Sequence, residues 1–192
     1  VILWFFGLNG NNGQPFSGLS KEYKEFVGGE LFRLGNVAVP MYVLYAVILV
    51  AVMWFVWNKT KLGKNMYAIG GNTEAAEVSG VNIVKNIMII FVISGVLYGI
   101  AGFLEAARIG STTSNTGLNY DLDAISASVI GGVSFSGGVG TIPGVIMGAV
   151  ILQFINYGLT FVGVSPYLQY IIKGLIIILA VSIDVRKYIV KK

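Results

Sequence analysis

Two long apolar runs without any charge bound what this chain can fold into. No charged residue occurs from Leu34 to Asn58, and none occurs between Lys85 and Glu105. A helix of about 20 apolar residues is long enough to cross the hydrocarbon core of a bilayer. The two runs therefore predict transmembrane helices. We expect an all-α fold, a polytopic transmembrane helical bundle, in which residues 1–192 form a single domain.

The composition supports a membrane protein and excludes several other classes. Hydrophobic residues make up 55% of the chain and charged residues 11%, with a mean hydropathy of +0.78, which lies outside the range of soluble domains. The net charge of +4 is too small and too dispersed to indicate nucleic-acid binding. The chain has no cysteine and no histidine, which excludes disulfides, thiolate metal sites, cysteine nucleophiles, histidine-dependent hydrolase triads and HExxH zinc sites. We expect no catalytic residue, no metal and no cofactor in this chain.

Further apolar segments indicate additional membrane crossings. The uncharged run from residue 124 to 172 is too long for one helix, and the glycines and proline of GGVSFSGGVGTIPG divide it. We predict a broken, glycine-rich membrane segment there, because irregular backbone at membrane depth is tolerated where it is buried in protein or lines a cavity. Gly95, Gly99 and Gly102 share one face of the second run, which predicts close packing against another helix. The expected spans are residues 41–57, 83–107, 124–142, 143–161 and 166–183.

The first 36 residues give weaker signals. The apolar stub VILWFFGLNG is too short to span a membrane and indicates the end of a truncated helix. Residues 9–36 mix glycine, asparagine, serine and proline with charges of both signs. Within them, SKEYKEFVGGELFRLG has a rough helical alternation that fits an amphipathic piece at the membrane surface, although we favour a solvated loop.

The distribution of basic residues predicts the orientation. Eight basic residues lie in the polar loop and the C-terminal tail, and four lie in segments expected on the opposite side of the membrane. The eight are Lys59, Lys61, Lys64, Lys85, Arg186, Lys187, Lys191 and Lys192. The positive-inside rule places this larger set in the cytoplasm. An even number of crossings must then separate residues 58–85 from the C-terminal tail, so residues 124–142 should cross once. A re-entrant hairpin within 112–143 would instead put the tail outside.

The polar stretch Asn58 to Lys85 carries the signals of a short helix. Asn72 is a favourable N-cap, Glu74 places a negative charge in the first turn, and Gly80 can adopt the left-handed conformation after the helix end. These signals predict a helix over residues 72–79. A helix this short is marginal in water without a surface to dock on, so it implies a partner. The alternative is a capped surface turn that only links two membrane helices.

Three stretches carry a resemblance to a known family. They are GKNMYAIGGNTEAAEVSGVNI at 63–83, GVSFSGGVGTIPG at 132–144 and NYGLTFVGVSPYLQYIIKG at 156–174. They resemble the sugar-type permeases of ATP-binding-cassette (ABC) importers, of the ribose and galactose/methyl-galactoside type. The resemblance implies that the short helix is the coupling helix, seated in a cleft of the ATPase subunit, within a cytoplasmic coupling loop at 58–85. The residues assigned to ATPase coupling are Gly71, Asn72, Glu74, Ala75, Ala76, Glu77, Ser79 and Gly80.

The same resemblance implies a function and a set of partners. The chain would be a multi-pass permease subunit in a bacterial cytoplasmic membrane, with a cytoplasmic C-terminus, that moves galactose, a methyl-galactoside or a related monosaccharide by alternating access. It would work with a second copy of itself, an ABC ATPase subunit, a periplasmic or lipid-anchored sugar-binding protein and membrane lipid. The sequence has no GxxxxGK[ST] phosphate-binding loop, so the ATPase would be a separate chain. Family permeases are considerably longer, and this chain resembles the C-terminal half of one.

Several alternatives stay open. One is an ATP-independent channel or facilitator, in which the short capped helix would have no purpose. Another is a membrane scaffold that transports nothing. Within the same family, the solute would be ribose, another sugar or a branched-chain amino acid.

Polar residues near the broken segment are candidates for a solute pathway. Neutral hydroxyl and amide groups suit the passage of an uncharged polyhydroxy solute. Serines in membrane helices also commonly hold helices together, which is the simpler interpretation. The candidates are Ser126, Ser128, Ser134, Ser136 and Asn156.

Charged residues near the outer ends of the spans are candidates for contact with the sugar or its binding protein. They are Glu105, Arg108, Asp121, Asp123 and Lys173. The alternative for the first four is a solvated rim with an i,i+3 pair between Glu105 and Arg108. Lys173 follows Pro166 by seven residues, which places it about 10 Å into the last span. It therefore either snorkels to the interface or pairs with Glu105 or Asp123.

Overall fold

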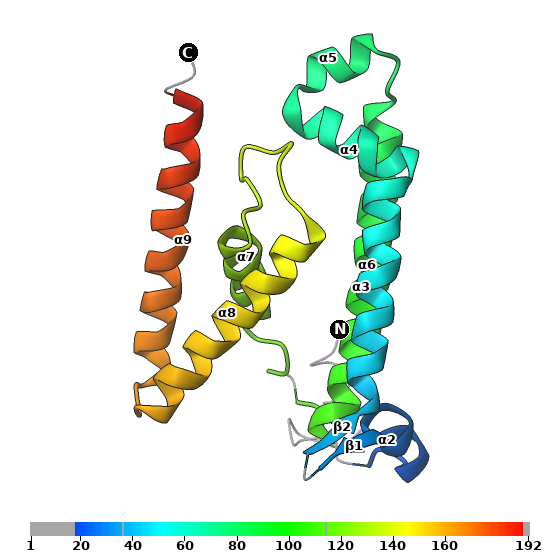
Figure 1. Cartoon of the computed structure of the whole chain (residues 1–192), viewed down its shortest axis with the longest axis vertical. Coiled ribbons are helices and arrows are strands. Elements are labelled where there is room, and N and C mark those ends of the chain that lie inside the picture. Colours follow the sequence, from blue (N-terminus) through cyan, green and yellow to red (C-terminus); the bar gives the residue numbers. More distant parts are fainter. Residues whose placement is uncertain (1–17, 36, 114, 190–192) are drawn as a thin grey trace, which may run out of the picture. The chain divides into compact units, whose positions relative to one another are not determined.

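The computed structural model describes residues 18–35, 37–113 and 115–189. Within these ranges the chain forms eight helices and one two-stranded hairpin (Figure 1). Their bounds are α2 Lys21–Gly28, β1 Glu30–Leu34, β2 Val37–Pro40, α3 Met41–Lys59, α4 Lys61–Gly71, α5 Thr73–Val78, α6 Ile83–Ile109, α7 Tyr120–Ile130, α8 Ile142–Phe161 and α9 Pro166–Ile189. The predicted fold class, an all-α transmembrane bundle, is confirmed.

Three described helices, α3, α6 and α8, are long and apolar enough to cross a membrane. The most apolar windows of α3 and α6 bury 0% of their residues inside the chain, and that of α8 buries 11%. Their apolar side chains are therefore left for lipid or other membrane helices to cover. In α9 the described apolar part is Pro166–Ser182, and Asp184 and basic residues lie further along the chain. The broken segment is confirmed as well, since residues 131–141 separate α7 from α8 without helix.

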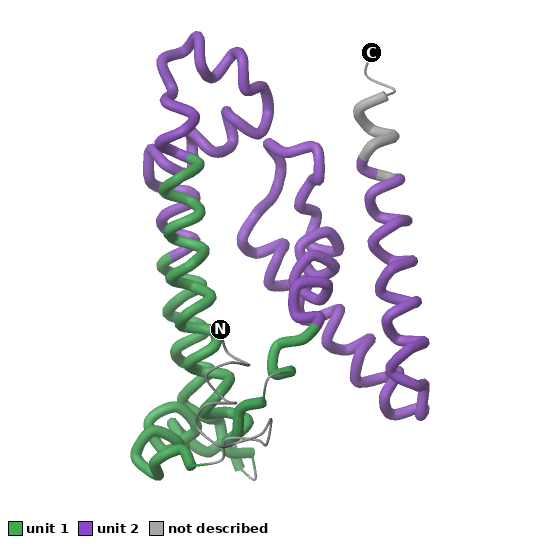
Figure 2. Tube along the Cα trace, turned by 180° about the vertical axis from the view of Figure 1, so that it is seen from behind, with its two compact units in different colours: residues 1–52, 87–118 green, residues 53–86, 119–192 purple. Residues whose placement is uncertain are grey.

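The chain divides into two compact units, which Figure 2 shows in green and purple. Unit 1 contains residues 1–52 and 87–118, with α2, the hairpin, the first part of α3 and most of α6. Unit 2 contains residues 53–86 and 119–192, with α4, α5 and α7 to α9. The two units are described separately below.

In unit 1, α2 is fixed to both long helices by aromatic side chains. The ring of Tyr23 lies 4.7 Å from that of Phe103 between centroids, and its hydroxyl donates to the Phe103 carbonyl. The Tyr45 hydroxyl donates to the carbonyl of Phe26 at 2.8 Å, and Val27 is fully buried. The favoured solvated loop is therefore wrong for this stretch. The expectation of a truncated helix at the start of the chain lies outside the described residues.

A short antiparallel hairpin that the sequence did not predict leads into α3. Arg33 pairs with Ala38 across the two strands, and Gly35 turns the chain with a φ of 60°. On β1, the Arg33 guanidinium binds both carboxylate oxygens of Glu30, at 2.6 and 2.7 Å. This hydrogen bonding lowers the pKa of the exposed Glu30 carboxyl below its usual value.

In unit 2, α7 and α8 cross where glycines let their backbones touch. A Cβ atom added at Gly148 would lie 2.0 Å from the carbonyl oxygen of Ala127. One added at Gly131 would lie 2.4 Å from the carbonyl oxygen of Gly144. Gly144 and Gly148 are four residues apart and so share a face of α8. Only glycine fits this crossing, which is the close packing that small residues permit between membrane helices.

We expect Gly148→Ala to destabilise the protein by about 1–3 kcal/mol, the usual cost of forcing extra volume into a close contact. Gly158→Ala on the same helix is the matched control, because a Cβ there meets nothing within 4 Å and alanine favours helix by about 1 kcal/mol. Melting temperatures of the two purified variants in one detergent test this. A Gly148→Ala protein that melts no lower than the Gly158→Ala protein would contradict the crossing.

The face of α6 formed by Gly95, Gly99 and Gly102 is not in close contact with another described element, unlike the glycines at the α7–α8 crossing. A Cβ at any of the three would meet no atom within 4 Å. The predicted close packing of this face against another helix is therefore not found within the described residues.

Candidate functional site

The polar stretch after α3 begins with a helix, α4, that the sequence interpretation missed. The Thr60 hydroxyl caps it by accepting from the Gly63 backbone N–H at 3.4 Å and donates to the Val56 carbonyl at 2.6 Å. Gly63 allows the sharp turn out of α3, because a Cβ there would lie 1.9 Å from the Trp57 carbonyl oxygen. Three glycines in KLGKNMYAIGG masked the helix, although Leu62, Met66 and Ile69 have helical i, i+4, i+7 spacing.

The predicted short helix is present as α5, with the predicted caps. The Asn72 side chain accepts from the Ala75 backbone N–H at 2.9 Å. At the other end, the Ser79 N–H donates to the Ala75 carbonyl, and Gly80 has a φ of 83°. Asn72 also ends α4, since its own N–H donates to the Ala68 carbonyl at 3.0 Å. One residue thus joins the two helices and caps both.

The residues assigned to ATPase coupling are not equivalent in the structure. Ala76 is 3% exposed and turned toward the chain itself, so it cannot contact a partner directly. The other seven are exposed. The sequence interpretation missed Val78, which is 90% exposed at the end of α5. An apolar side chain that the chain itself leaves uncovered on a short helix suits a docking surface.

A buried amide pair ties α4 to the start of α6. The Asn65 side chain donates to the Asn86 side chain at 3.2 Å, and Asn86 in turn donates to the Asn82 carbonyl at 2.7 Å. Asn86 is 7% exposed, so these bonds matter because an unpaired amide there would be costly. The polar stretch is therefore an ordered helical element rather than a flexible linker.

The glycine-rich segment, residues 131–141, touches α4 through its backbone. A Cβ at Gly70 would lie 2.5 Å from the Gly138 nitrogen, and one at Gly137 would lie 2.6 Å from the Gly70 carbonyl oxygen. One helical turn before Gly70, the Tyr67 hydroxyl donates to the Gly140 carbonyl at 2.6 Å. The segment and α4 therefore fit together along one face of α4.

The same segment is also bound by α9. One carboxylate oxygen of Asp184 accepts from the Ser134 hydroxyl at 2.7 Å and from the Phe135 backbone N–H at 3.0 Å. The Ser134 oxygen accepts from the Ser136 N–H at 3.1 Å. Ser134, a candidate for the solute pathway, is thus engaged in holding the segment, whereas Ser136 is exposed. Asp184 is a residue that sequence reasoning did not single out.

Of the remaining pathway candidates, Ser128 lines the same hollow as Ser134, whereas Ser126 and Asn156 do not line it. Ser126 is fully buried and donates to the Leu122 carbonyl of its own helix at 2.7 Å, and Ser128 donates to the Ala124 carbonyl in the same manner. Such bonds satisfy a hydroxyl within its helix.

A hollow of about 220 Å³ lies between α7 and the glycine-rich segment. Its lining is mostly apolar, namely Ala124, Ile125, Ser128, Val129, Val133, Ser134 and Phe135.

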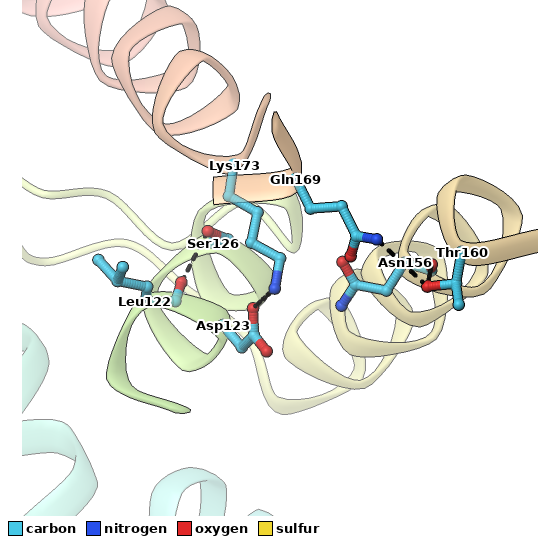
Figure 3. A network of polar contacts seen from close by, with 7 residues as sticks. All are labelled: Leu122, Asp123, Ser126, Asn156, Thr160, Gln169 and Lys173. Carbon is cyan, nitrogen blue, oxygen red and sulfur yellow. Dashed lines mark hydrogen bonds and ion pairs between the residues drawn. The ribbon is translucent and has the colours of Figure 1, made fainter. Parts of the chain in front are cut away.

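Asn156 lies in a separate polar cluster where α8 turns into α9 (Figure 3). Gln169 on α9 donates to the Val164 carbonyl at 3.0 Å and to the Thr160 hydroxyl at 3.4 Å. Figure 3 shows Asn156 and Gln169 pointing toward one another. The side-chain oxygen of Asn156 is buried, with no hydrogen-bond partner among the described residues. It is therefore an acceptor that remains available within this polar cluster.

Lys173 is paired rather than snorkelling. Its ammonium lies 2.5 Å from a carboxylate oxygen of Asp123 on α7, as Figure 3 shows, and 5.8 Å from the centre of the Tyr170 ring. Lys173 is 8% exposed. Of the two partners that the sequence left open, Asp123 is the one found. The pair joins α7 to α9 beside the polar cluster, since Gln169 and Lys173 are four residues apart on α9.

The other charged candidates lie on α6 and in the first turn of α7. Arg108 binds both carboxylate oxygens of Glu105 at 2.7 Å on α6, which is the i,i+3 pair considered from the sequence. Asp121 is exposed in the first turn of α7. A contact with a sugar-binding protein stays a prediction for these three residues.

Comparison with known proteins finds similarity to permeases of transport systems. Residues 1–181 match the profile of the family described as the branched-chain amino acid transport system / permease component. The galactose/methyl galactoside import permease protein of Haemophilus influenzae is 55% identical over 180 residues, which cover 94% of this chain and 53% of that protein. The ribose import permease protein of Escherichia coli is 40% identical over 179 residues, 92% and 54% of the two chains. No solved structure is significantly similar.

A further relative, the xylose transport system permease protein of Haemophilus influenzae, is 42% identical over 175 residues, which are 88% of this chain and 47% of that protein. The chain thus spans about half the length of these curated relatives. The family match includes α4, α5, the glycine-rich segment and the ion pair of Lys173. The resemblance to sugar-type permeases, read from three motifs, is confirmed, and the chain belongs to the permease component family of the branched-chain amino acid transport system.

Proposed function

We propose that the protein is the membrane subunit of an ABC importer that moves galactose, a methyl-galactoside or a related monosaccharide across the bacterial cytoplasmic membrane. The observation that carries the proposal is α5, a helix of six residues held by caps at both ends and exposing Glu74, Ala75 and Val78. A rigid, outward-facing helix between two membrane-spanning helices suits insertion into a cleft of another protein. The sugars named for its relatives support the solute class.

The proposed mechanism is alternating access without chemistry on the sugar. The ATPase subunit closes on ATP binding and moves α5, and the membrane helices switch the pathway from outward to inward facing. A second copy of the permease, a sugar-binding protein and membrane lipid complete the assembly. Within the pathway, the free buried acceptor of Asn156 is available to a sugar hydroxyl.

Contacts within unit 2 support a cytoplasmic C-terminus. Residues 131–141 reach both α4 and Asp184, near the end of α9. These contacts support placing the polar stretch with α4 and the end of α9 on the same side of the membrane, and the basic residues of both favour the cytoplasm. The first turn of α7 pairs instead with Lys173, near the start of α9. This arrangement favours one crossing between residues 120 and 141 over a re-entrant hairpin.

Sugar uptake tests the proposal. The protein is expressed from its complete gene, with its ATPase and binding protein, in cells that lack their own galactose importer. We expect ATP-dependent accumulation of labelled galactose that methyl-galactoside competes away more effectively than ribose, xylose or leucine. Uptake that persists with an ATPase unable to hydrolyse ATP would indicate a facilitator. Accumulation of leucine but of no sugar would move the solute to the branched-chain amino acids.

A further inference from the structure

The glycine-rich segment contacts α4, α9 and the start of α8. Inside the segment, the Ser134 N–H donates to the Val139 carbonyl at 3.0 Å and the Gly137 N–H donates to the Ser134 carbonyl at 3.3 Å. These bonds fold residues 134–139 into a compact turn. The turn is therefore held together by its own backbone hydrogen bonds.

The contact of this turn with α4 leaves no free space. Gly70 meets Gly137 and Gly138 backbone to backbone, so no flexible side chain separates the two elements. Such contacts are stiff, because closely packed atoms transmit a displacement instead of absorbing it. Tyr67 adds a hydrogen bond on the same face. A movement of α4 must therefore displace the turn.

The contact of α4 with α5 is equally direct. Asn72 caps both helices, the Thr73 hydroxyl donates to the Ile69 carbonyl at 3.0 Å, and Ala76 is buried. The two helices therefore form one body. A force on the exposed face of α5 is passed to the Tyr67 and Gly70 face without an intervening flexible linker.

Asp184 on α9 also holds this turn by hydrogen bonds. Its carboxylate accepts two hydrogen bonds, from a hydroxyl and from a backbone N–H, and bonds to a charged acceptor are the strong ones. These two bonds tie the turn to α9. Its ends continue into α7 and α8, which carry Asp123 and Asn156.

We propose that the glycine-rich segment is the element that transmits the movement of α5 to the membrane helices, and that Asp184 is the positioning residue that sets its resting position. This inference rests on the proposed function, since it assigns the route by which the ATPase acts on the pathway. The two-state element is the turn at 134–139, biased by α4 on one side and by the Asp184 carboxylate on the other.

Coupling between ATP hydrolysis and transport tests the proposal in the reconstituted complex with ATPase and binding protein. Gly70→Ala places a methyl group 2.5 Å from the Gly138 nitrogen, and Tyr67→Phe removes only one hydroxyl. We expect both variants to keep the ATPase bound and hydrolysing ATP. Sugar transported per ATP should fall at least about tenfold for Gly70→Ala and several-fold for Tyr67→Phe, as expected for a displaced or loosened contact. Gly158→Ala is the control and should remain at the wild-type ratio.

The role of Asp184 is tested without transport, by hydrogen exchange in the purified protein. Asp184→Ala should speed exchange of the 131–141 amides by about tenfold, as expected from loss of a hydrogen bond to a charged group, while exchange in α3 stays unchanged. Asp184→Glu should restore part of the protection and part of the coupling ratio. Unchanged exchange in Asp184→Ala, or wild-type coupling in both α4 variants, would overturn the inference. Failure of the proposed function is distinct, because the wild-type protein itself would then bind no ATPase.

Discussion

Replacing Ala76 with proline is expected to abolish recovery of the ATPase subunit with the protein and to abolish sugar uptake, while its abundance in the membrane stays normal. The Ala76 N–H donates to the Asn72 carbonyl at 3.0 Å, and a proline there removes this bond. Interior proline costs a helix about 3 kcal/mol, which a helix of six residues cannot sustain. The membrane spans keep their apolar residues and should still insert. Co-purification from detergent, normalised to membrane abundance, measures the effect.

Ala76 is itself buried, so a second variant is needed to separate docking from folding. Ala75 is exposed on α5, and Ala75→Arg adds a long charged side chain to the outer face without breaking the helix, because arginine is a good helix former. We expect the same loss of the ATPase by steric exclusion. Lys61→Ala is the control, since Lys61 is exposed on α4 and outside α5. Undiminished recovery of the ATPase with both Ala76→Pro and Ala75→Arg would refute the coupling-helix assignment.

The features predicted from the sequence are those that local chemistry determines. The spans follow from uninterrupted apolar residues, which have no other stable location than a bilayer or a large core. The caps of α5 follow from the preferences of asparagine and glycine for particular backbone conformations. The break between α7 and α8 follows from glycine and proline content. Each of these signals lies within a few residues of the structure that it predicts.

The features missed depend on contacts between distant residues. Helix α4 contains Gly63, Gly70 and Gly71, which disfavour a helix in isolation, and its stability comes from capping and from contacts with other elements. Gly70 and Gly138 are far apart in the sequence, and nothing local indicates that their backbones touch. From the sequence, Asp184 likewise is only one more charged residue near the end of a helix. Only its distance to Ser134 and Phe135 reveals its role.

The ion pair of Lys173 lies between these cases, because the sequence marked the lysine as unusual but could not choose its partner. Seven residues into α9, an ammonium is costly unless it is paired or reaches the interface. The structure pairs it with Asp123 at 2.5 Å and leaves its side chain only 10% exposed. Asp123 is less enclosed, with 37% of its side chain exposed within this chain. Breaking the pair would therefore leave the Lys173 ammonium with less hydration than the Asp123 carboxylate.

Lys173→Met is consequently expected to destabilise the protein by about 3 kcal/mol, the low end for breaking a buried pair, because the partly exposed Asp123 carboxylate recovers some hydration. Lys173→Arg should stay near wild type, since the guanidinium can still reach the carboxylate. The double variant Lys173→Met/Asp123→Asn should regain most of the lost stability, because no charge is then left unpaired. Unfolding in detergent, followed for all three variants and for Asp123→Asn alone, gives the coupling energy of the pair. If Lys173→Met unfolds at the same temperature as the wild type, the lysine contributes only its apolar stem, and the pair does not hold α7 against α9.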